Sequence, residues 1–242
     1  MAMSNNKTVT EAWYDRSYSE KGFNAQRLYP NEELLRFFGR HFFGSVPLDE
    51  RKVIRVLEIG CGSCSNLWMI AHEGFDAYGV DISAASLELG GMMLKRWGVT
   101  AKLTKASMTD LSYEDGFFDV VADVFSSYCL GQNDFGICLD EVARVLKNNG
   151  RFFSYTPSCN SDAFQNYRPA GKIDKWTLDG IRRKSSPFYG NNYPFRFTDS
   201  EVYRDMLTQR GLEVDCLETV ERTYGNRTER FEFLVVDAQK RQ

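Results

Sequence analysis

The strongest constraint on the fold is a regular alternation, over residues 51–156, of short runs rich in β-branched and aromatic residues with longer segments of helical periodicity. The strand-like runs are RKVIRVLEIG, DAYGVDI, TAKLTKA, FFDVVADVFS and RFFSYT. The helix-like segments that separate most of them are SNLWMIAHEGF, AASLELGGMMLKRW and FGICLDEVARVLKNNG. Strands that alternate with helices predict right-handed βαβ units, and therefore a mostly parallel sheet.

The C-terminal part continues with a helix, SEVYRDMLTQRG, and two further strands, LEVDCLETVERTY and ERFEFLVVDAQ. Between these strands lie Gly225 and Asn226, which are typical of a hairpin turn, so the last strand is expected to be antiparallel. Together the runs predict an α/β fold with a Rossmann-like sheet of seven strands, mostly parallel with an antiparallel last strand, and with helices on both faces.

Composition narrows the classes of function. The chain has 242 residues and a net charge of −3, with 43% hydrophobic and 26% charged residues, as in an ordinary globular domain. Because basic residues are not in excess, the charge of the chain does not favour nucleic acid as a partner. The first residues lack a secretion signal, and no apolar run approaches the roughly 20 residues that span a bilayer. We therefore expect a cytoplasmic protein without membrane contact, and the sequence carries no signal for its oligomeric state.

Six cysteines are spread over the chain, and Cys61 and Cys64 have the C-x-x-C spacing of redox pairs. In a chain without an export signal, cysteines are expected to be reduced. A zinc site would need a second cysteine pair or clustered histidines, whereas His41 and His72 stand apart from any such pair. We therefore expect neither a metal site nor a redox pair.

The segment VLEIGCGSCSNL places Gly60 and Gly62 in a turn between a predicted strand and a predicted helix. Glycines there let the backbone approach a ligand closely, and the free N–H groups of the helix favour partial negative charge. Asp81 ends the second strand, 19 residues after Gly62, where a carboxylate can accept hydrogen bonds from ribose hydroxyls. These features indicate an adenosine-type cofactor. A dinucleotide fingerprint would need a third glycine where Ser65 stands, and the carboxylate of Glu58 suits a cationic ligand better than a pyrophosphate.

VLEIGCGSCSN followed by GVDIS resembles the first two motifs of the class I S-adenosylmethionine (SAM)-dependent methyltransferases, whose loop reads acidic-x-Gly-x-Gly. DGFFDVVADVFSSYCL is similar to the fourth-strand motif of that family, and EVARVLKNNGRFF to its next helix and fifth strand. The resemblance extends from Arg51 to Thr156, and the two C-terminal strands fit the reversed hairpin of the family. One departure is Cys64, which stands where the family loop usually has a glycine. The resemblance implies SAM as cofactor and S-adenosylhomocysteine (SAH) as product.

The resemblance also implies which residues contact the cofactor. Those expected along its amino-acid moiety are Glu58, Gly60, Cys61 and Gly62. Asp81 is expected to hold the ribose hydroxyls. Ile82, Ser107 and Met108 are expected beside the adenine, and Asp123 and Val124 beside the methyl donor. Ser107 stands where the family commonly has an aspartate.

Residues 1–50 resemble a helical cap that small-molecule members of the family place over the cofactor, and residues 51–242 would form the methyltransferase domain. An aromatic wall that stabilises the sulfonium by cation–π attraction would consist of Trp13, Tyr14, Tyr18 and Tyr29. Tyr14 and Tyr18 are also candidates for acceptor contact. Arg36 would pair with the SAM carboxylate. Ordinary packing of a helix onto the domain explains the aromatic residues equally well.

A polar insertion, residues 158–197, follows the fifth strand at the carboxyl edge of the sheet, where open α/β folds bind ligands. Its basic side chains outnumber its acidic ones, and Arg168, Arg182 and Arg183 are candidates for binding a phosphorylated or carboxylated acceptor. A solvated basic loop is the alternative.

Methyl transfer from a sulfonium is an in-line displacement that needs a nearby nucleophile and the exclusion of water. Where a general base is needed, Tyr155 and Asp123, at the ends of two strands, are the candidates. The sequence predicts transfer to an oxygen or nitrogen of a small acceptor such as a phosphorylated or nucleotide-linked sugar, by general likeness to bacterial polysaccharide-associated methyltransferases. Two alternatives are a SAM-binding module without activity and a nicotinamide-dependent oxidoreductase.

Overall fold

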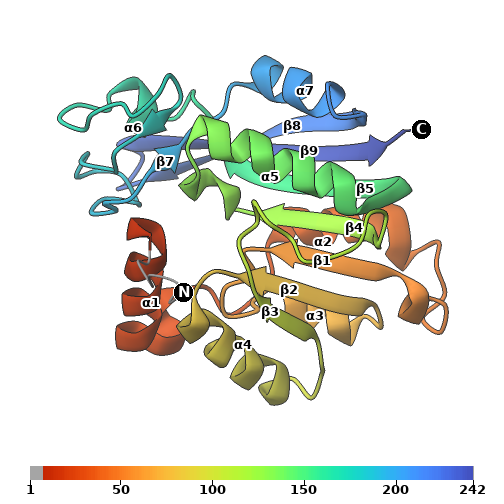
Figure 1. Cartoon of the computed structure of the whole chain (residues 1–242). Helices are drawn as coiled ribbons and strands as arrows, with labels where there is room; N and C mark the ends of the chain where they lie inside the picture. The colour runs from red at the N-terminus through yellow and green to blue at the C-terminus, as the bar shows by residue number, and fades with distance from the viewer. Residues whose placement is uncertain (1–7, 242) are drawn as a thin grey trace, which may run out of the picture.

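The computed structural model describes residues 8–241 and contains a seven-stranded sheet in the order β3-β2-β1-β4-β5-β9-β8 (Figure 1). Its strands are β1 Arg55–Ile59, β2 Asp76–Asp81, β3 Lys102–Lys105, β4 Phe118–Val124, β5 Leu146–Pro157, β8 Leu212–Tyr224 and β9 Glu229–Lys240. Strands β1 to β5 pair in parallel, and β9 is antiparallel to both β5 and β8. The predicted fold class is confirmed, with Gly225 and Asn226 in the β8–β9 turn at φ angles of 55° and 56°.

Helices cover both faces of the sheet because neighbouring strand residues point to opposite sides. Val56 of β1 belongs to one hydrophobic core and Leu57 to the other. The first core includes residues of α2 Glu32–Phe38, α3 Leu67–His72 and α4 Ala84–Arg96. The second includes residues of α5 Gln132–Val145 and α7 Ser200–Thr208. The central strands β1 and β4 are therefore buried on both faces, as their near-continuous apolar sequences predict, whereas the edge strands β3 and β8 are more exposed.

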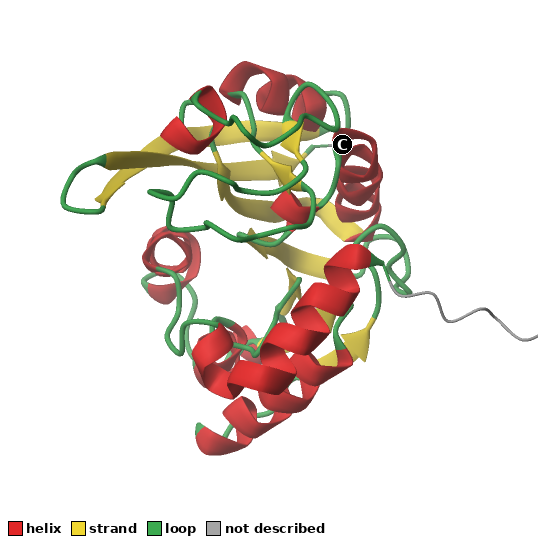
Figure 2. Cartoon of the chain, turned by 90° about the vertical axis from the view of Figure 1, so that its left-hand side faces the viewer, coloured by secondary structure: helices red, strands yellow, loops and turns green. Residues whose placement is uncertain are grey.

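Two segments lie at the carboxyl edge of the parallel strands, at the left of Figure 1 and facing the viewer in Figure 2. One is α1 Val9–Lys21 with the 3-10 turn η1 Gly22–Ala25. The other is the insertion, which contains α6 Asp162–Gln165 and the antiparallel pair β6 Thr177–Leu178 and β7 Phe195–Arg196. The remaining short elements are the π-helix η2 Gly39–Phe43 and the 3-10 turns η3 Arg51–Val53 and η4 Ser127–Cys129.

The predicted N-terminal cap divides into two parts. Residues 1–7 lie outside the described residues, and α1 with η1 lies over the carboxyl edge. Helix α2 instead buries Leu34, Phe37 and Phe38 in the core on the face of the sheet. Only the first half of this segment therefore covers the edge where a ligand would bind.

Cys61 and Cys64 are free and buried, at 1% and 0% exposure. The sulfur of Cys61 packs on Gly79 of β2, and that of Cys64 packs on Gly90 of α4. Cys64 has a φ of 62°, the left-handed conformation that favours glycine. Both thiols therefore fill space between the loop and its neighbours.

Within residues 8–241, no group of three or more His, Cys, Asp or Glu side chains is placed to hold a metal ion. The helices of this same part of the chain are all too short or too polar to cross a membrane.

Glu58 is a buried carboxyl group beneath the glycine loop, at 2% exposure. Its Oε1 accepts a hydrogen bond from Nδ2 of Asn66 at 2.5 Å, and Oδ1 of Asn66 accepts one from the backbone N–H of Asn31 at 2.8 Å. Oε2 of Glu58 is buried without a hydrogen-bond partner. Burial raises the pKa of Glu58 to about 8. Glu58 thus orients the asparagine that fixes the start of α2, at the cost of an unfavourable charged form.

Replacing Glu58 with Gln is expected to flatten the dependence of stability on pH. Above its ordinary pKa of 4.5 the unfolded state loses the Glu58 proton, whereas the folded state keeps it until about pH 8. The free energy of unfolding of the wild type therefore falls as pH rises through this window, by up to about 1.4 kcal/mol per pH unit from this group. Denaturant unfolding between pH 5 and 8 measures the two slopes, and equal slopes would contradict this role of Glu58.

Two adjacent glycines of α4 should respond oppositely to alanine. A Cβ at Gly90 would lie 2.6 Å from the buried sulfur of Cys64, whereas a Cβ at Gly91 would meet nothing within 4 Å. We expect Gly90→Ala to destabilise the protein by about 1–3 kcal/mol through overpacking, and Gly91→Ala to stabilise it by about 1 kcal/mol through helix propensity. Denaturant midpoints of the two variants decide, and equal effects would show that the loop does not press on α4.

Candidate active site

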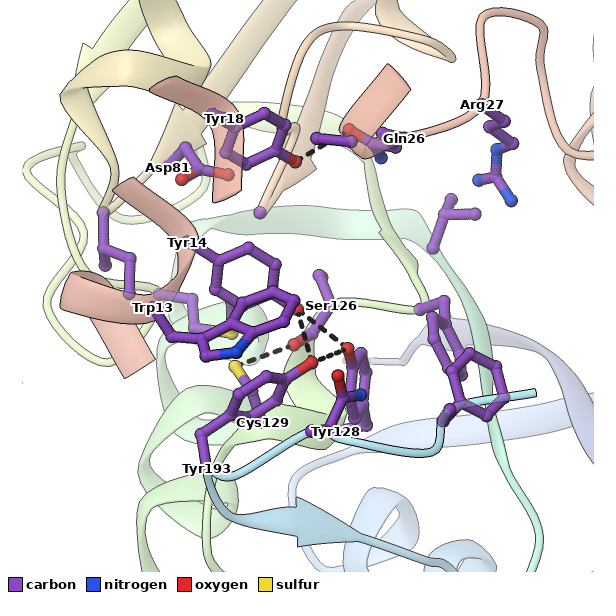
Figure 3. Close-up of a pocket in the computed structure, with 18 of the residues that line it drawn as sticks. Trp13, Tyr14, Tyr18, Gln26, Arg27, Asp81, Ser126, Tyr128, Cys129 and Tyr193 are labelled. Carbon is purple, nitrogen blue, oxygen red and sulfur yellow. Dashed lines mark hydrogen bonds between the residues drawn. The ribbon is translucent and has the colours of Figure 1, made fainter. Parts of the chain in front are cut away.

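A cavity of about 350 Å³ lies at the carboxyl edge of the sheet (Figure 3). Loops that follow β1 to β4, the first helix with η1, and the insertion all contribute to its wall. The lining residues are Trp13, Tyr14, Tyr18, Ala25, Gln26, Arg27, Gly60, Asp81, Ile82, Ala106, Met108, Val124, Phe125, Ser126, Tyr128, Cys129, Phe188, Asn191 and Tyr193. A concave site at this edge is where open α/β folds bind their ligands.

Asp81 is held at one end of the cavity by the glycine loop. The backbone N–H groups of Gly62 and Ser83 donate to its Oδ2 and Oδ1, each at 2.8 Å. Burial raises the pKa of this carboxyl group. An ionised carboxylate has about four lone-pair sites, so each oxygen keeps one for a ligand hydroxyl. This geometry suits the neighbouring hydroxyls of a ribose.

Gly60 marks the closest approach of the loops after β1 and β4. Its φ is 63°, and a Cβ there would lie 2.4 Å from the Cβ of Ser126. The hydroxyl of Ser126 lies 2.6 Å from the carbonyl oxygen of Ile59 and 2.6 Å from Oδ1 of Asp123. A side chain at position 60 would force these loops apart, so glycine keeps the cradle in shape.

The cap rests directly on the glycine loop. Oε1 of Gln26 accepts a hydrogen bond from the hydroxyl of Tyr18 at 2.9 Å (Figure 3). The same oxygen accepts one from the backbone N–H of Ser63 at 3.1 Å. A Cβ at Gly62 would lie 2.3 Å from the same oxygen. Gln26 and Arg27 both line the cavity, but neither was identified from the sequence, because single polar residues in a loop form no pattern.

The structure places five of the twelve predicted cofactor residues in the wall of the cavity. Those in the wall are Gly60, Asp81, Ile82, Met108 and Val124. Cys61 and Gly62 lie in the same loop but not in the wall, and Glu58 is buried beneath them. Ser107 turns its hydroxyl to Thr109 at 2.7 Å, and Ala106 lines the cavity in its place.

Tyr29 and Arg36 lie away from the cavity, contrary to the prediction. Tyr29 is 60% exposed, and its ring packs edge-on against Trp68 and Trp97. Arg36 pairs with Glu32 at 2.9 Å on the surface of α2. Both follow from the packing of α2 on the face of the sheet. The cation at the cavity wall is instead Arg27, the candidate partner for a ligand carboxylate.

Neither predicted general base is placed to act as one. Asp123 is 1% exposed, and its Oδ1 accepts from the backbone N–H groups of Ser126 at 3.2 Å and Ser127 at 3.0 Å. Its lone pairs are therefore used beneath the loop. Tyr155 stacks on Phe233 with ring centroids 4.6 Å apart, and burial raises the pKa of its hydroxyl. Neither residue is in the cavity wall.

The arginines of the insertion do not line the cavity either. Nη1 of Arg182 donates to the carbonyl oxygen of Asn191 at 3.1 Å, and Nε of Arg183 pairs with Glu229 at 2.7 Å. Arg168 is exposed. The insertion instead contributes to the wall through Phe188, Asn191 and Tyr193. The segment predicted to recognise the acceptor thus borders the cavity, but with neutral side chains.

Three tyrosine hydroxyls meet at the other end of the cavity (Figure 3). The hydroxyl of Tyr14 lies 2.8 Å from that of Tyr128 and 3.2 Å from that of Tyr193, and the last two are 2.6 Å apart. Burial raises the pKa of all three, so they are neutral. Of these residues only Tyr14 was predicted, because Tyr128 and Tyr193 lie in segments without periodicity.

The wall fits the parts of SAM. Asp81 would hold the ribose, and the apolar side chains of Ile82 and Met108 would flank the adenine. Gly60 lets the loops after β1 and β4 meet beneath the cofactor, and Arg27 would face the carboxylate. Each of these parts of SAM thus has a matching group among the described residues.

Comparisons with known proteins agree with this geometry. A family model described as "Methyltransferase domain" matches residues 56–150. The chain is 28% identical over 207 residues to sterol 4-C-methyltransferase of Caenorhabditis elegans. This match covers 85% of this chain and 57% of that protein. The chain spans about half the length of the curated relatives it matches.

Solved structures share the fold. A SAM-dependent methyltransferase of Methanosarcina mazei has a TM-score of 0.63 at 19% identity, over 77% of this chain and 92% of its own. A 1,6-didemethyltoxoflavin-N1-methyltransferase of Burkholderia thailandensis, solved with SAH, has a TM-score of 0.58 at 13% identity, over 100% of this chain and 95% of its own. Residues 56–150 therefore match a methyltransferase domain, and the chain shares its fold with these solved methyltransferases.

Proposed function

We propose that the protein transfers the methyl group of SAM to a small-molecule acceptor held in the same cavity. The observation that carries this proposal is the composition of the wall of one cavity. At one end are the glycine loop and the carboxylate of Asp81, and at the other are aromatic side chains from α1, the loop after β4 and the insertion. A cofactor and an acceptor that share one cavity can be held in the line that displacement requires.

The bound cofactor would supply an electrophilic methyl group on a positively charged sulfur. The residues of this chain bind, orient and exclude water. Tyr18 and Gln26 close the cap over the glycine loop, and Trp13 packs edge-on against Tyr193 with ring centroids 4.9 Å apart. Exclusion of water strengthens electrostatic interactions and prevents hydrolysis. Aromatic faces beside a sulfonium add cation–π attraction.

The names of relatives agree with a small-molecule acceptor. One relative is named for a sterol, and another for phthiotriol and phenolphthiotriol dimycocerosates. The basic residues of the insertion favoured an anionic sugar as acceptor. Arg182 and Arg183, however, bond to Asn191 and Glu229 and do not line the cavity. The chemistry of the wall is therefore the better guide to the acceptor.

Isothermal titration calorimetry with SAM, SAH and NAD tests the cofactor. We expect SAM and SAH to bind and NAD not to bind. Asp81→Ala should weaken SAM and SAH by at least about tenfold, since it removes charge-assisted hydrogen bonds worth roughly 1.5–3 kcal/mol. Asp110→Ala is the matched control, because Asp110 is exposed and lies outside the cavity wall.

Binding of NAD alone, or of none of the three, would reject the proposal. Binding of SAM without formation of SAH across a broad set of acceptors would favour the module without activity.

A further inference from the structure

The end of the cavity away from Asp81 has no charged side chain. Among the lining residues, all of which lie in the described part of the chain, only Asp81 and Arg27 are charged. Both contact or adjoin the glycine loop and the cap: Asp81 accepts from Gly62, and Nη2 of Arg27 lies 3.4 Å from Oδ1 of Asn66. A charged acceptor at the far end would lose its water without gaining a counter-charge, which is unfavourable by several kcal/mol.

Burial at this end disfavours anions. The thiol of Cys129 lies in the wall beside Tyr128. Its pKa is raised to about 12, chiefly by burial, while the charges of Asp81 and Asp123 are opposed by that of Arg196. A phosphate or carboxylate placed beside this thiol would meet the same burial.

Besides the side-chain amide of Asn191, the polar groups that the insertion and its neighbours bring to this wall are the hydroxyls of Tyr14, Tyr128 and Tyr193. Three hydroxyls have three donor hydrogens and six acceptor lone pairs, so their three mutual contacts leave lone pairs free. The longest contact, 3.2 Å between Tyr14 and Tyr193, is the weakest of the three. One hydroxyl can therefore turn its hydrogen to a ligand at small cost. The cluster can both donate to and accept from a neutral polar group.

The remaining wall at this end is aromatic. The ring of Phe125 stacks on that of Tyr128 with centroids 4.2 Å apart and lies 5.0 Å from that of Phe188. Trp13 packs on Tyr193 from the cap. Flat rings on several sides favour a ligand with apolar, ring-shaped surface.

We propose that the acceptor is an uncharged, largely apolar ring compound with one oxygen or nitrogen atom that hydrogen-bonds to the hydroxyls of Tyr14, Tyr128 and Tyr193. This proposal rests on the proposed function, because it concerns the acceptor end of that cavity. The three tyrosines are positioning residues for the acceptor. They come from α1, η4 and the insertion, so the polar anchor forms only when the three segments are assembled.

The test uses the full chain saturated with SAH and three probes of one ring system: 2-naphthol, naphthalene and 1-naphthyl phosphate. Affinities are measured by ligand-observed NMR for the wild type and for Tyr193→Phe. We expect 2-naphthol to bind about fivefold to tenfold more tightly than naphthalene, as one hydrogen bond provides, and 1-naphthyl phosphate at least about tenfold more weakly than 2-naphthol. Tyr193→Phe should remove most of the advantage of 2-naphthol and leave naphthalene unchanged.

Tyr189→Phe is the matched control in the same insertion, because Tyr189 is 54% exposed and outside the wall. Tyr128→Phe is the second variant, used if Tyr193→Phe does not fold, and the same outcome is expected. SAH affinity of each variant is measured first, so that a failure of the proposed function is seen separately as a loss of SAH binding by the wild type.

Three results would overturn the proposal: tighter binding of 1-naphthyl phosphate than of 2-naphthol, an equal loss of 2-naphthol and naphthalene in Tyr193→Phe, or no binding of either neutral probe to a wild type that binds SAH. The second result would assign the tyrosines to packing alone.

Discussion

The shape of the cavity depends on the buried carboxylate of Asp123. Asp123 is the penultimate residue of β4, and it accepts hydrogen bonds from the backbone N–H groups of Ser126 and Ser127 and, at 2.5 Å, from the hydroxyl of Ser127. A buried carboxylate is stable only when its lone pairs are satisfied. Asp123 therefore dictates the turn after β4, in which Phe125 takes a positive φ of 57°. A residue that first suggested a catalytic base thus acts as the anchor of a loop.

That turn links the two ends of the site. It brings Ser126 against Gly60 at the cofactor end and places Tyr128 in the wall at the other end. Arg196 of β7 is fully buried and lies 3.3 Å from the hydroxyl of Ser127, so the insertion is tied to the same loop. The guanidinium also offsets the charge of Asp123, with which it interacts electrostatically. One polar network beneath the wall therefore sets the positions of segments that are distant in sequence.

The sequence predicted what depends on local pattern and on strand ends. Alternating runs predicted the sheet, and residues at the ends of strands, such as Asp81, Ile82 and Val124, lie in the cavity wall. Contacts between distant loops carry no such pattern: Tyr128 and Tyr193 are 65 residues apart, and Tyr14 and Tyr193 are 179 apart. The excess of basic residues in the insertion did not predict which side chains line the cavity. The sequence does not reveal that Arg183 pairs with Glu229, 46 residues downstream. Burial of that glutamate at 0% exposure explains why its arginine is not available to a ligand.

Helix α1 connects the same two ends from the solvent side. Tyr14 and Tyr18 are four residues apart and therefore share one face, with ring centroids 6.1 Å apart. Tyr18 reaches Gln26 above the glycine loop, while Tyr14 joins the tyrosine cluster. Unlike α2, which buries Leu34, Phe37 and Phe38, α1 has no continuous apolar stripe, so its position depends on these polar and ring contacts. Through Tyr18 and Tyr14, a single helix thus contacts the wall at both ends of the cavity.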